Sequence, residues 1–290
     1  MTFYRHLTIN GIRIFYREAG DTGAPVLLLL HGFPASSFMF RDLIARLSGR
    51  FRIIAPDYPG FGYSDPPKAD EVAYTFDFLA DIMNRFVEKL ELNKYAIYMQ
   101  DFGGPVGFRL AHKHPERVAF FVIQNANAYE EGLPDNFWAP LRELWANPSP
   151  ENFDKIREAG ISRDALEWNY THGVKNSENS EMISPDSWVL QDALLNRPGN
   201  KELMLKLLYD YRSNPPQYPA WHEYFRRHQP PALIAWGKND IIFPEAGAHP
   251  YRRDLKNVDF HLLDTGHFAL EDHSEEISIL IREFAAKQGF

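Results

Sequence analysis

The 290-residue chain contains no cysteine. Disulfide bonds, thiol catalysis and thiolate metal sites are therefore excluded, and the absence agrees with a reducing compartment such as the cytoplasm. Long apolar runs are also missing, because stretches such as Val26–Leu30 and Val118–Ile123 are far too short to cross a bilayer. Residues 1–6 lack the apolar stretch of a secretory signal peptide. We therefore expect a cytoplasmic protein that is not inserted in a membrane.

An excess of basic residues is absent as well. The chain has 31 Lys and Arg against 39 Asp and Glu, which gives a net charge of −8. This balance argues against nucleic acid and anionic membranes as partners, because neither would attract an acidic surface. Hydrophobic residues make up 44% and charged residues 24%, as in ordinary globular domains. No sequence feature fixes the oligomeric state.

Strand and helix patterns alternate through the first 128 residues. Residues 2–9 and 13–18 alternate apolar and polar positions around Asn10-Gly11, which predicts a hairpin. The segment Pro25–Leu30 is apolar throughout, as expected for a strand buried on both faces of a parallel sheet. The same reasoning predicts strands at residues 51–55, 95–99 and 118–123, and helices at residues 38–47, 76–90 and 103–114.

This rhythm stops after residue 128. Residues 129–228 are rich in aromatics and prolines, with helical patterns and no convincing strand. Strand patterns return at residues 232–236 and 258–263, before a closing helix at about 271–288. The sequence therefore predicts an α/β fold: a core of residues 1–128 and 229–290, with a mostly parallel sheet flanked by helices. A helical cap of residues 129–228 would cover a pocket at the carboxyl ends of the strands.

The candidate nucleophile lies in the segment Met99–Gly104, between a predicted strand and a predicted helix. A sharp strand-to-helix turn needs small residues on its inner side, and Gly103 and Gly104 supply them. Such a turn would expose Asp101 above the sheet, beside the positive end of the helix. An ionised carboxylate there can attack a saturated carbon and form a covalent ester. An aspartate at this kind of junction is more often a helix cap, so the assignment depends on its partners.

Two partners follow the last two predicted strands. Asp240 comes just after residues 232–236, and His267 just after residues 258–263. We predict that His267 acts as a base and that Asp240 orients it. Backbone N–H groups of Phe33 and Phe102 are expected to stabilise the oxyanion formed during ester hydrolysis.

These motifs together resemble the α/β-hydrolase superfamily, in its branch of epoxide hydrolases and haloalkane dehalogenases. The resemblance covers nearly the whole chain. It rests on the order of nucleophile, acid and histidine, and on the segments His31–Pro34, Asp57–Ser64, the elbow at Asp101, Asp240 and Gly266-His267. It implies a hydrolase that acts on a small apolar organic substrate through an aspartate nucleophile and needs neither a cofactor nor a metal. The alternative position for the acid holds Asn125 and Asn127, which cannot carry its charge.

The two activities of this branch differ in the leaving group. Epoxide hydrolases resemble one another in using cap tyrosines to protonate the opened ring, and Tyr211-Arg212-x-Asn214 resembles their late-cap segment. The resemblance thus implies Tyr211 as proton donor, and we take Tyr170 as a hypothesis for the second tyrosine. Dehalogenases usually hold the halide with a tryptophan directly after the nucleophile, or with an asparagine after His-Gly. Those two positions hold Phe102 and Phe33, and phenylalanine has no N–H.

Other features favour dehalogenation. Gln100 precedes the nucleophile, as in many dehalogenases, and Trp168 or Trp188 could donate an N–H to a halide from the cap. Epoxide hydrolysis is therefore our first interpretation and haloalkane dehalogenation the alternative. A hydrolase-like ligand receptor with slow turnover is the third interpretation. Carboxylesterase activity is disfavoured because the elbow holds no serine.

Overall fold

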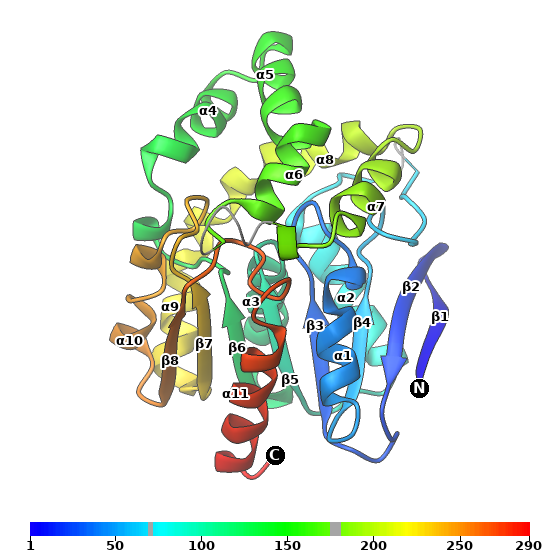
Figure 1. Cartoon of the computed structure of the whole chain (residues 1–290), viewed down its shortest axis with the longest axis vertical. Helices are drawn as coiled ribbons and strands as arrows, with labels where there is room; N and C mark the ends of the chain where they lie inside the picture. The colour runs from blue at the N-terminus through cyan, green and yellow to red at the C-terminus, as the bar shows by residue number, and fades with distance from the viewer. Residues whose placement is uncertain (69–71, 175–180) are drawn as a thin grey trace.

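An eight-stranded sheet runs through the computed structural model, which describes residues 1–68, 72–174 and 181–290 (Figure 1). The strand order is β1-β2-β4-β3-β5-β6-β7-β8. The β1–β2 and β2–β4 pairs are antiparallel, and all pairs from β4 through β8 are parallel. The strands are β1 (Thr2–Ile9), β2 (Ile12–Ala19), β3 (Val26–Leu30), β4 (Arg52–Pro56), β5 (Tyr95–Gln100), β6 (Val118–Gln124), β7 (Ala232–Gly237) and β8 (Val258–Leu263). The predicted α/β architecture with a mostly parallel sheet is confirmed.

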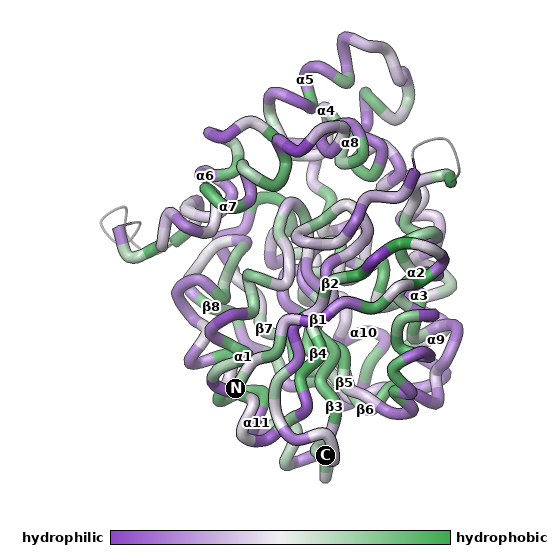
Figure 2. The backbone as a smooth tube through the Cα atoms, turned by 90° about the vertical axis from the view of Figure 1, so that its right-hand side faces the viewer, coloured by the Kyte–Doolittle hydropathy of each residue, from purple (hydrophilic) through white to green (hydrophobic). Residues whose placement is uncertain are grey.

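Helices cover both faces of this sheet (Figure 2). One face carries α1 (Arg41–Leu47) and α11 (Ser274–Lys287), which pack on each other. The other carries α2 (Phe76–Lys89), α3 (Gly103–Lys113), α9 (Tyr218–His228) and α10 (Tyr251–Asp254). Two-sided coverage explains why the central strands are apolar at nearly every position, since neither of their faces meets water.

The remaining helices form the predicted cap above the carboxyl ends of the strands (Figure 1). They are α4 (Asp135–Ala146), α5 (Pro150–Ile161), α6 (Arg163–Thr171), α7 (Asp186–Leu195) and α8 (Asn200–Asp210). Helix α9 instead packs against α3 and α10 at the level of the sheet. Among the described residues from 129 to 228 no strand occurs. No helix in the described parts of the chain is long and apolar enough to cross a membrane.

The closing helix begins later than its sequence pattern predicts. It starts at Ser274 rather than near Glu271. The Glu271 carboxylate is engaged elsewhere, because it accepts hydrogen bonds from both terminal nitrogens of Arg41, at 2.7 and 3.2 Å. It also accepts one from the Ser187 hydroxyl of α7 at 3.0 Å. This buried carboxylate therefore ties the cap to the core.

The close approach of α3 to β3 generates a stability prediction. A Cβ atom on Gly103 would lie 2.2 Å from the carbonyl oxygen of Leu30, so an alanine must push helix and strand apart. We expect Gly103→Ala to lower the free energy of unfolding by about 1–3 kcal/mol in urea titrations. The control is Gly49→Ala, where the added Cβ meets no atom within 4 Å. Equal stability of the two variants would contradict the account.

Candidate active site

Asp101 occupies the turn between β5 and α3, as the sequence predicts. Its φ of +50° lies in the left-handed region, which is uncommon for a residue with a side chain and recurs where function requires strain. The side chain is only 5% exposed. The backbone N–H of Phe33, just after β3, donates to Asp101 Oδ1 at 2.5 Å. The backbone N–H of Phe102 also faces the carboxylate and lowers its pKa. The two N–H groups named from the sequence thus meet at this carboxylate.

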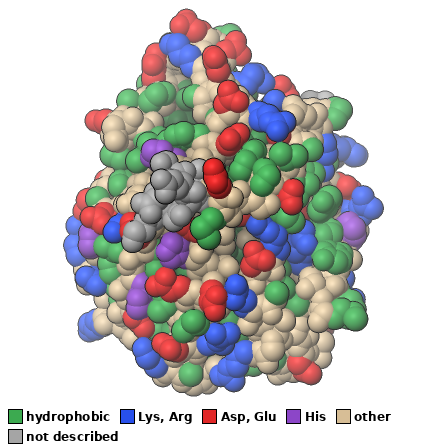
Figure 3. Space-filling view, in the orientation of Figure 1, with side chains coloured by type: hydrophobic (Ala, Val, Ile, Leu, Met, Phe, Trp, Pro, Cys, Tyr) green, Lys and Arg blue, Asp and Glu red, His purple; other side chains and the backbone are tan. Residues whose placement is uncertain are grey.

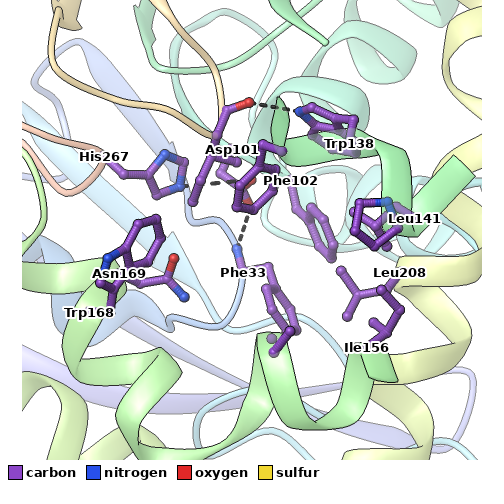
Figure 4. Close-up of a pocket in the computed structure, with 15 residues that line it drawn as sticks. Phe33, Asp101, Phe102, Trp138, Leu141, Ile156, Trp168, Asn169, Leu208 and His267 are labelled. Atoms are coloured by element: carbon purple, nitrogen blue, oxygen red, sulfur yellow. Dashed lines mark hydrogen bonds and ion pairs between the residues drawn. The ribbon is translucent and has the colours of Figure 1, made fainter. Parts of the chain in front are cut away.

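His267 and Asp240 reach the same point from the loops after β8 and β7. His267 Nδ1 lies 2.7 Å from Asp240 Oδ2. Its Nε2 lies 3.9 Å from Asp101 Oδ2 (Figure 4). The first distance is that of a strong charge-assisted hydrogen bond, whereas the second is too long for one. Asp240 Oδ1 accepts the backbone N–H of Ile242 at 2.8 Å. The three predicted side chains are therefore together in the fold.

Asn125 orients Asp240, which the sequence analysis did not foresee. Its amide donates to Asp240 Oδ2 at 2.8 Å and to the Gly237 carbonyl at 3.1 Å. Its own oxygen accepts the Gly237 N–H at 2.8 Å. Sequence reasoning weighed Asn125 only as an uncharged residue at an alternative acid position. The available signal was a polar residue directly after a buried strand, which does not by itself name a partner.

Burial and neighbouring charges set the ionisation of this group. Burial raises the pKa of Asp101 to about 6, and His267 and the Phe33 N–H oppose the rise. Burial disfavours the charged form of His267, but the Asp240 and Asp101 carboxylates outweigh it and raise the pKa of His267 above 6.5. As the pH rises, Asp101 therefore loses its proton first, near pH 6, and His267 becomes neutral at a higher pH.

A pocket lies above Asp101, between the elbow and helices α4, α5, α6 and α8 (Figure 4). Most of its lining is apolar: Phe33, Phe102, Phe137, Trp138, Pro140, Leu141, Ile156, Ala159, Gly160, Leu208 and Ile242. The other lining side chains are Asp101, His267, Trp168 and Asn169. Such a pocket suits an apolar molecule with one reactive polar end.

The uncommitted hydrogen-bond donors of this lining come from α6. The indole N–H of Trp138 is used, since it donates to the Ile242 carbonyl at 2.8 Å. The Trp168 indole and the Asn169 amide line the pocket and have no hydrogen-bond partner among the described residues. Trp168 was named from the sequence as a cap donor, whereas Asn169 was not. Its position beside Trp168 was visible, but helix periodicity does not tell which neighbour faces a pocket.

Tyr211 lies behind the pocket wall rather than in it. Its ring packs on Trp138 and Phe102, with ring centres 4.8 and 5.9 Å apart, and both of those rings line the pocket. Its buried hydroxyl has no hydrogen-bond partner of acceptable geometry among the described residues. Burial raises the pKa of this hydroxyl well above 10, and Tyr218 and Asp101 add to the rise. Tyr211 is thus a fully protonated phenol within electrostatic reach of the carboxylate.

Tyr170 lies outside the pocket lining. Its ring stacks on Phe268 at 4.0 Å, and the charges of Glu271 and Arg41 act on its hydroxyl. Its position next to Asn169 turns it to the other side of α6. Trp188 packs 6.4 Å from the Tyr170 ring and is likewise absent from the lining.

Comparison with known proteins identifies the fold family. Residues 25–274 match the family described as alpha/beta hydrolase fold. The chain belongs to this family. A hydrolase of Saccharomyces cerevisiae described as uncharacterized is 43% identical over 287 residues, which cover 97% of each chain. This match extends over both the core and the cap helices of the chain.

Relatives with described activities include both classes expected from the motifs. Haloalkane dehalogenase 2 of Mycobacterium tuberculosis is 42% identical over 113 residues, which cover 39% of this chain and 38% of that protein. Epoxide hydrolase 3 of Xenopus tropicalis is 25% identical over 293 residues, which cover 97% and 77%. A haloalkane dehalogenase structure from Bradyrhizobium elkani superposes with a TM-score of 0.83 at 21% identity, covering 100% and 99%. These matches support a hydrolase and do not separate the two activities.

The buried carboxylate generates a pH-dependent stability prediction. A folded-state pKa of about 6 against 3.8 means that the fold prefers protonated Asp101, so the ionised carboxylate opposes folding at higher pH. We expect Asp101→Asn to raise the free energy of unfolding at pH 8, by up to about 3 kcal/mol. The gain should shrink below pH 6 and vanish near pH 3, where both states of the wild type are protonated. Denaturant titrations at these pH values check it, and a gain independent of pH would contradict it.

Proposed function

We propose that this hydrolase acts on small apolar substrates through a covalent ester on Asp101. The supporting observation is a buried carboxylate that faces an apolar pocket while it contacts the Phe33 N–H and lies beside His267. Among the residues that the structure describes, the pocket lining offers no serine, threonine or lysine that could replace Asp101 as nucleophile. A carboxylate needs no base for its attack, so His267 is available for the second step.

The geometry supports the following sequence. An Asp101 oxygen attacks a substrate carbon, and the bond from that carbon to the leaving group breaks. His267 then takes a proton from a water molecule, which adds to the carboxyl carbon of the ester. The N–H groups of Phe33 and Phe102 stabilise the tetrahedral oxyanion. Its collapse releases the alcohol, which takes the proton from His267, and leaves Asp101 as a carboxylic acid. Loss of that proton restores the carboxylate; with a halide substrate the proton leaves with the halide as acid, and with an epoxide substrate it returns to the Tyr211 phenolate that protonated the alkoxide.

Epoxides are the substrate class we favour. Ring opening leaves an alkoxide, which needs a proton, and Tyr211 is a protonated phenol on which the Asp101 charge acts. Its ring packs on Phe102 and Trp138, which line the pocket, so the hydroxyl lies directly behind the pocket wall. The product would be a vicinal diol. Tyr170 and Tyr211 both lie outside the pocket lining, but the Asp101 charge acts on the Tyr211 hydroxyl, whereas Glu271 and Arg41 act on the Tyr170 hydroxyl. Tyr170 therefore has no part in this proposal.

Haloalkane dehalogenation is the second candidate, and a specific observation favours it. The uncommitted donors in the lining are the Trp168 indole and the Asn169 amide, which donate hydrogen bonds without releasing a proton. A departing halide needs hydrogen-bond donors of this kind. The limited stretch of similarity to the mycobacterial dehalogenase agrees with this alternative.

An ester-trapping experiment separates the candidates. His267→Gln should form the ester and fail to hydrolyse it. We would expose it to an equimolar mixture of styrene oxide and a bromoalkane of different mass and then record intact-protein mass spectra. A shift by the whole epoxide is the expected result, and a shift by the alkyl group alone would establish dehalogenation.

The control is Asp101→Asn combined with His267→Gln, which should remain unmodified by either probe. Labelling of this double variant would overturn the assignment of the nucleophile. Absence of any label on His267→Gln would instead favour the ligand receptor, and slow wild-type turnover of both probes would agree with that reading.

Tyr211→Phe tests the leaving-group assignment. We expect ester formation from the epoxide to slow by at least about 10²-fold, because the variant lacks the phenol that protonates the alkoxide. Alkylation by the bromoalkane should change by less than about threefold, since a halide needs no proton. Stopped-flow or quenched single-turnover assays measure both. Tyr209→Phe, two residues earlier in α8, is the matched control, and equal effects of the two variants would remove Tyr211 from the mechanism.

A further inference from the structure

Gln100 is the last residue of β5, directly before Asp101, and the steps above give it no part. Its side chain is fully buried. The amide Nε2 lies 2.9 Å from His267 Nε2, while the amide Oε1 is buried and has no hydrogen-bond partner among the described residues. A Cβ atom on Gly32 would lie 2.2 Å from that oxygen, so the glycine leaves the amide its space. A buried amide with one satisfied end needs a functional explanation.

The direction of the hydrogen bond to His267 follows from its other nitrogen. The Asp240 carboxylate, 2.7 Å from Nδ1, is an acceptor, so Nδ1 carries the hydrogen. Neutral His267 then presents a lone pair at Nε2, and the Gln100 amide donates to it. Asp101 Oδ2, at 3.9 Å, is too distant to compete. The reactive nitrogen of the base is therefore held by Gln100 and not by the nucleophile.

We propose that Gln100 is a positioning residue for ester hydrolysis, which donates an N–H to Nε2 of neutral His267 and thereby holds the base in its unprotonated form. This inference rests on the proposed function for its kinetic consequence. After His267 has taken a proton from water, Nε2 becomes a donor and no longer fits the Gln100 N–H.

The groups around the imidazole make a neutral donor useful there. The titratable side chains that act on His267 are Asp240, from the loop after β7, and Asp101, from the elbow. Both are carboxylates that favour the protonated imidazole. The rings of Phe243 and Phe268 pack near it, and α6 adds only uncharged side chains to the pocket lining. Gln100 is thus the group that opposes the two carboxylates at the reactive nitrogen.

The first test needs no substrate. Gln100→Met keeps the length of the side chain but removes the donor, which destabilises the neutral form of His267. We expect the pKa of His267 to rise by about half to one unit. A pH titration monitored by ¹⁵N NMR of histidine-labelled protein measures this change. The His267→Gln variant assigns the signal, because the resonance of His267 is missing from its spectrum. Gln100→Glu places an acceptor against Nε2 and should raise the pKa further. An unchanged pKa in both variants would overturn the proposal.

Gln124→Met is the matched control. The Gln124 amide donates to the backbone carbonyl of His267 at 2.9 Å and leaves the imidazole ring alone. Loss of this bond should lower the stability of the loop without moving the pKa of the ring. A pKa shift as large as that of Gln100→Met would show a general packing effect and would overturn the role assigned to Gln100.

The kinetic test separates this inference from the proposed function. In single-turnover experiments with styrene oxide, Gln100→Met should form the ester at the wild-type rate and hydrolyse it with an acid limb shifted to higher pH. Ester formation with an unshifted limb would overturn the role of Gln100 while preserving the Asp101 mechanism. Failure of every variant to form an ester would refute the proposed function and leave the NMR result standing.

Discussion

The close approach of α3 to β3 positions the nucleophile and the loop after β3 that contacts it. Gly103 lies against the Leu30 carbonyl, and no side chain fits between them. This contact forces the chain through a sharp turn and places Asp101 at a positive φ, with its side chain above the sheet. The same contact brings the end of β3 beside the elbow, so that Phe33 donates to Asp101. A backbone constraint thus builds the nucleophile and part of its oxyanion site together.

Burial of the Asp101 carboxylate destabilises the fold, but the same burial makes the carboxylate more reactive. Partial removal from water raises the pKa of Asp101 and leaves the ionised form a stronger nucleophile than a solvated carboxylate. Hydrogen bonds around His267 hold the other buried polar groups of the site in place. Asp240 is fixed by Asn125 and Ile242, and His267 is fixed by Asp240 and Gln100, so each buried polar group constrains the next. Nonadditive effects are expected when members of this chain are substituted together.

The sequence was sufficient for the core and for the positions of Asp101, Asp240 and His267, because each follows a buried strand and parallel strands end at the same sheet edge. Gly103 and Gly104 also allowed the sharp turn at Asp101 to be predicted. The cap was harder, since its helices pack aromatics on several sides and periodicity does not separate Asn169, which lines the pocket, from Tyr170, which faces Phe268. Asn125 and Gln100 were missed as partners because the sequence shows that both lie at the ends of buried strands but does not show which neighbour each amide contacts.

Oxygen-isotope labelling tests the central claim, an ester on Asp101, most directly. A single turnover of styrene oxide by excess wild-type enzyme in H₂¹⁸O should release a diol whose new oxygen is unlabelled, because that oxygen comes from Asp101. The peptide containing Asp101 should then carry one ¹⁸O, delivered when water attacks the carboxyl carbon of the ester. A labelled diol together with an unlabelled Asp101 peptide would show direct attack of water on the substrate and would contradict the account.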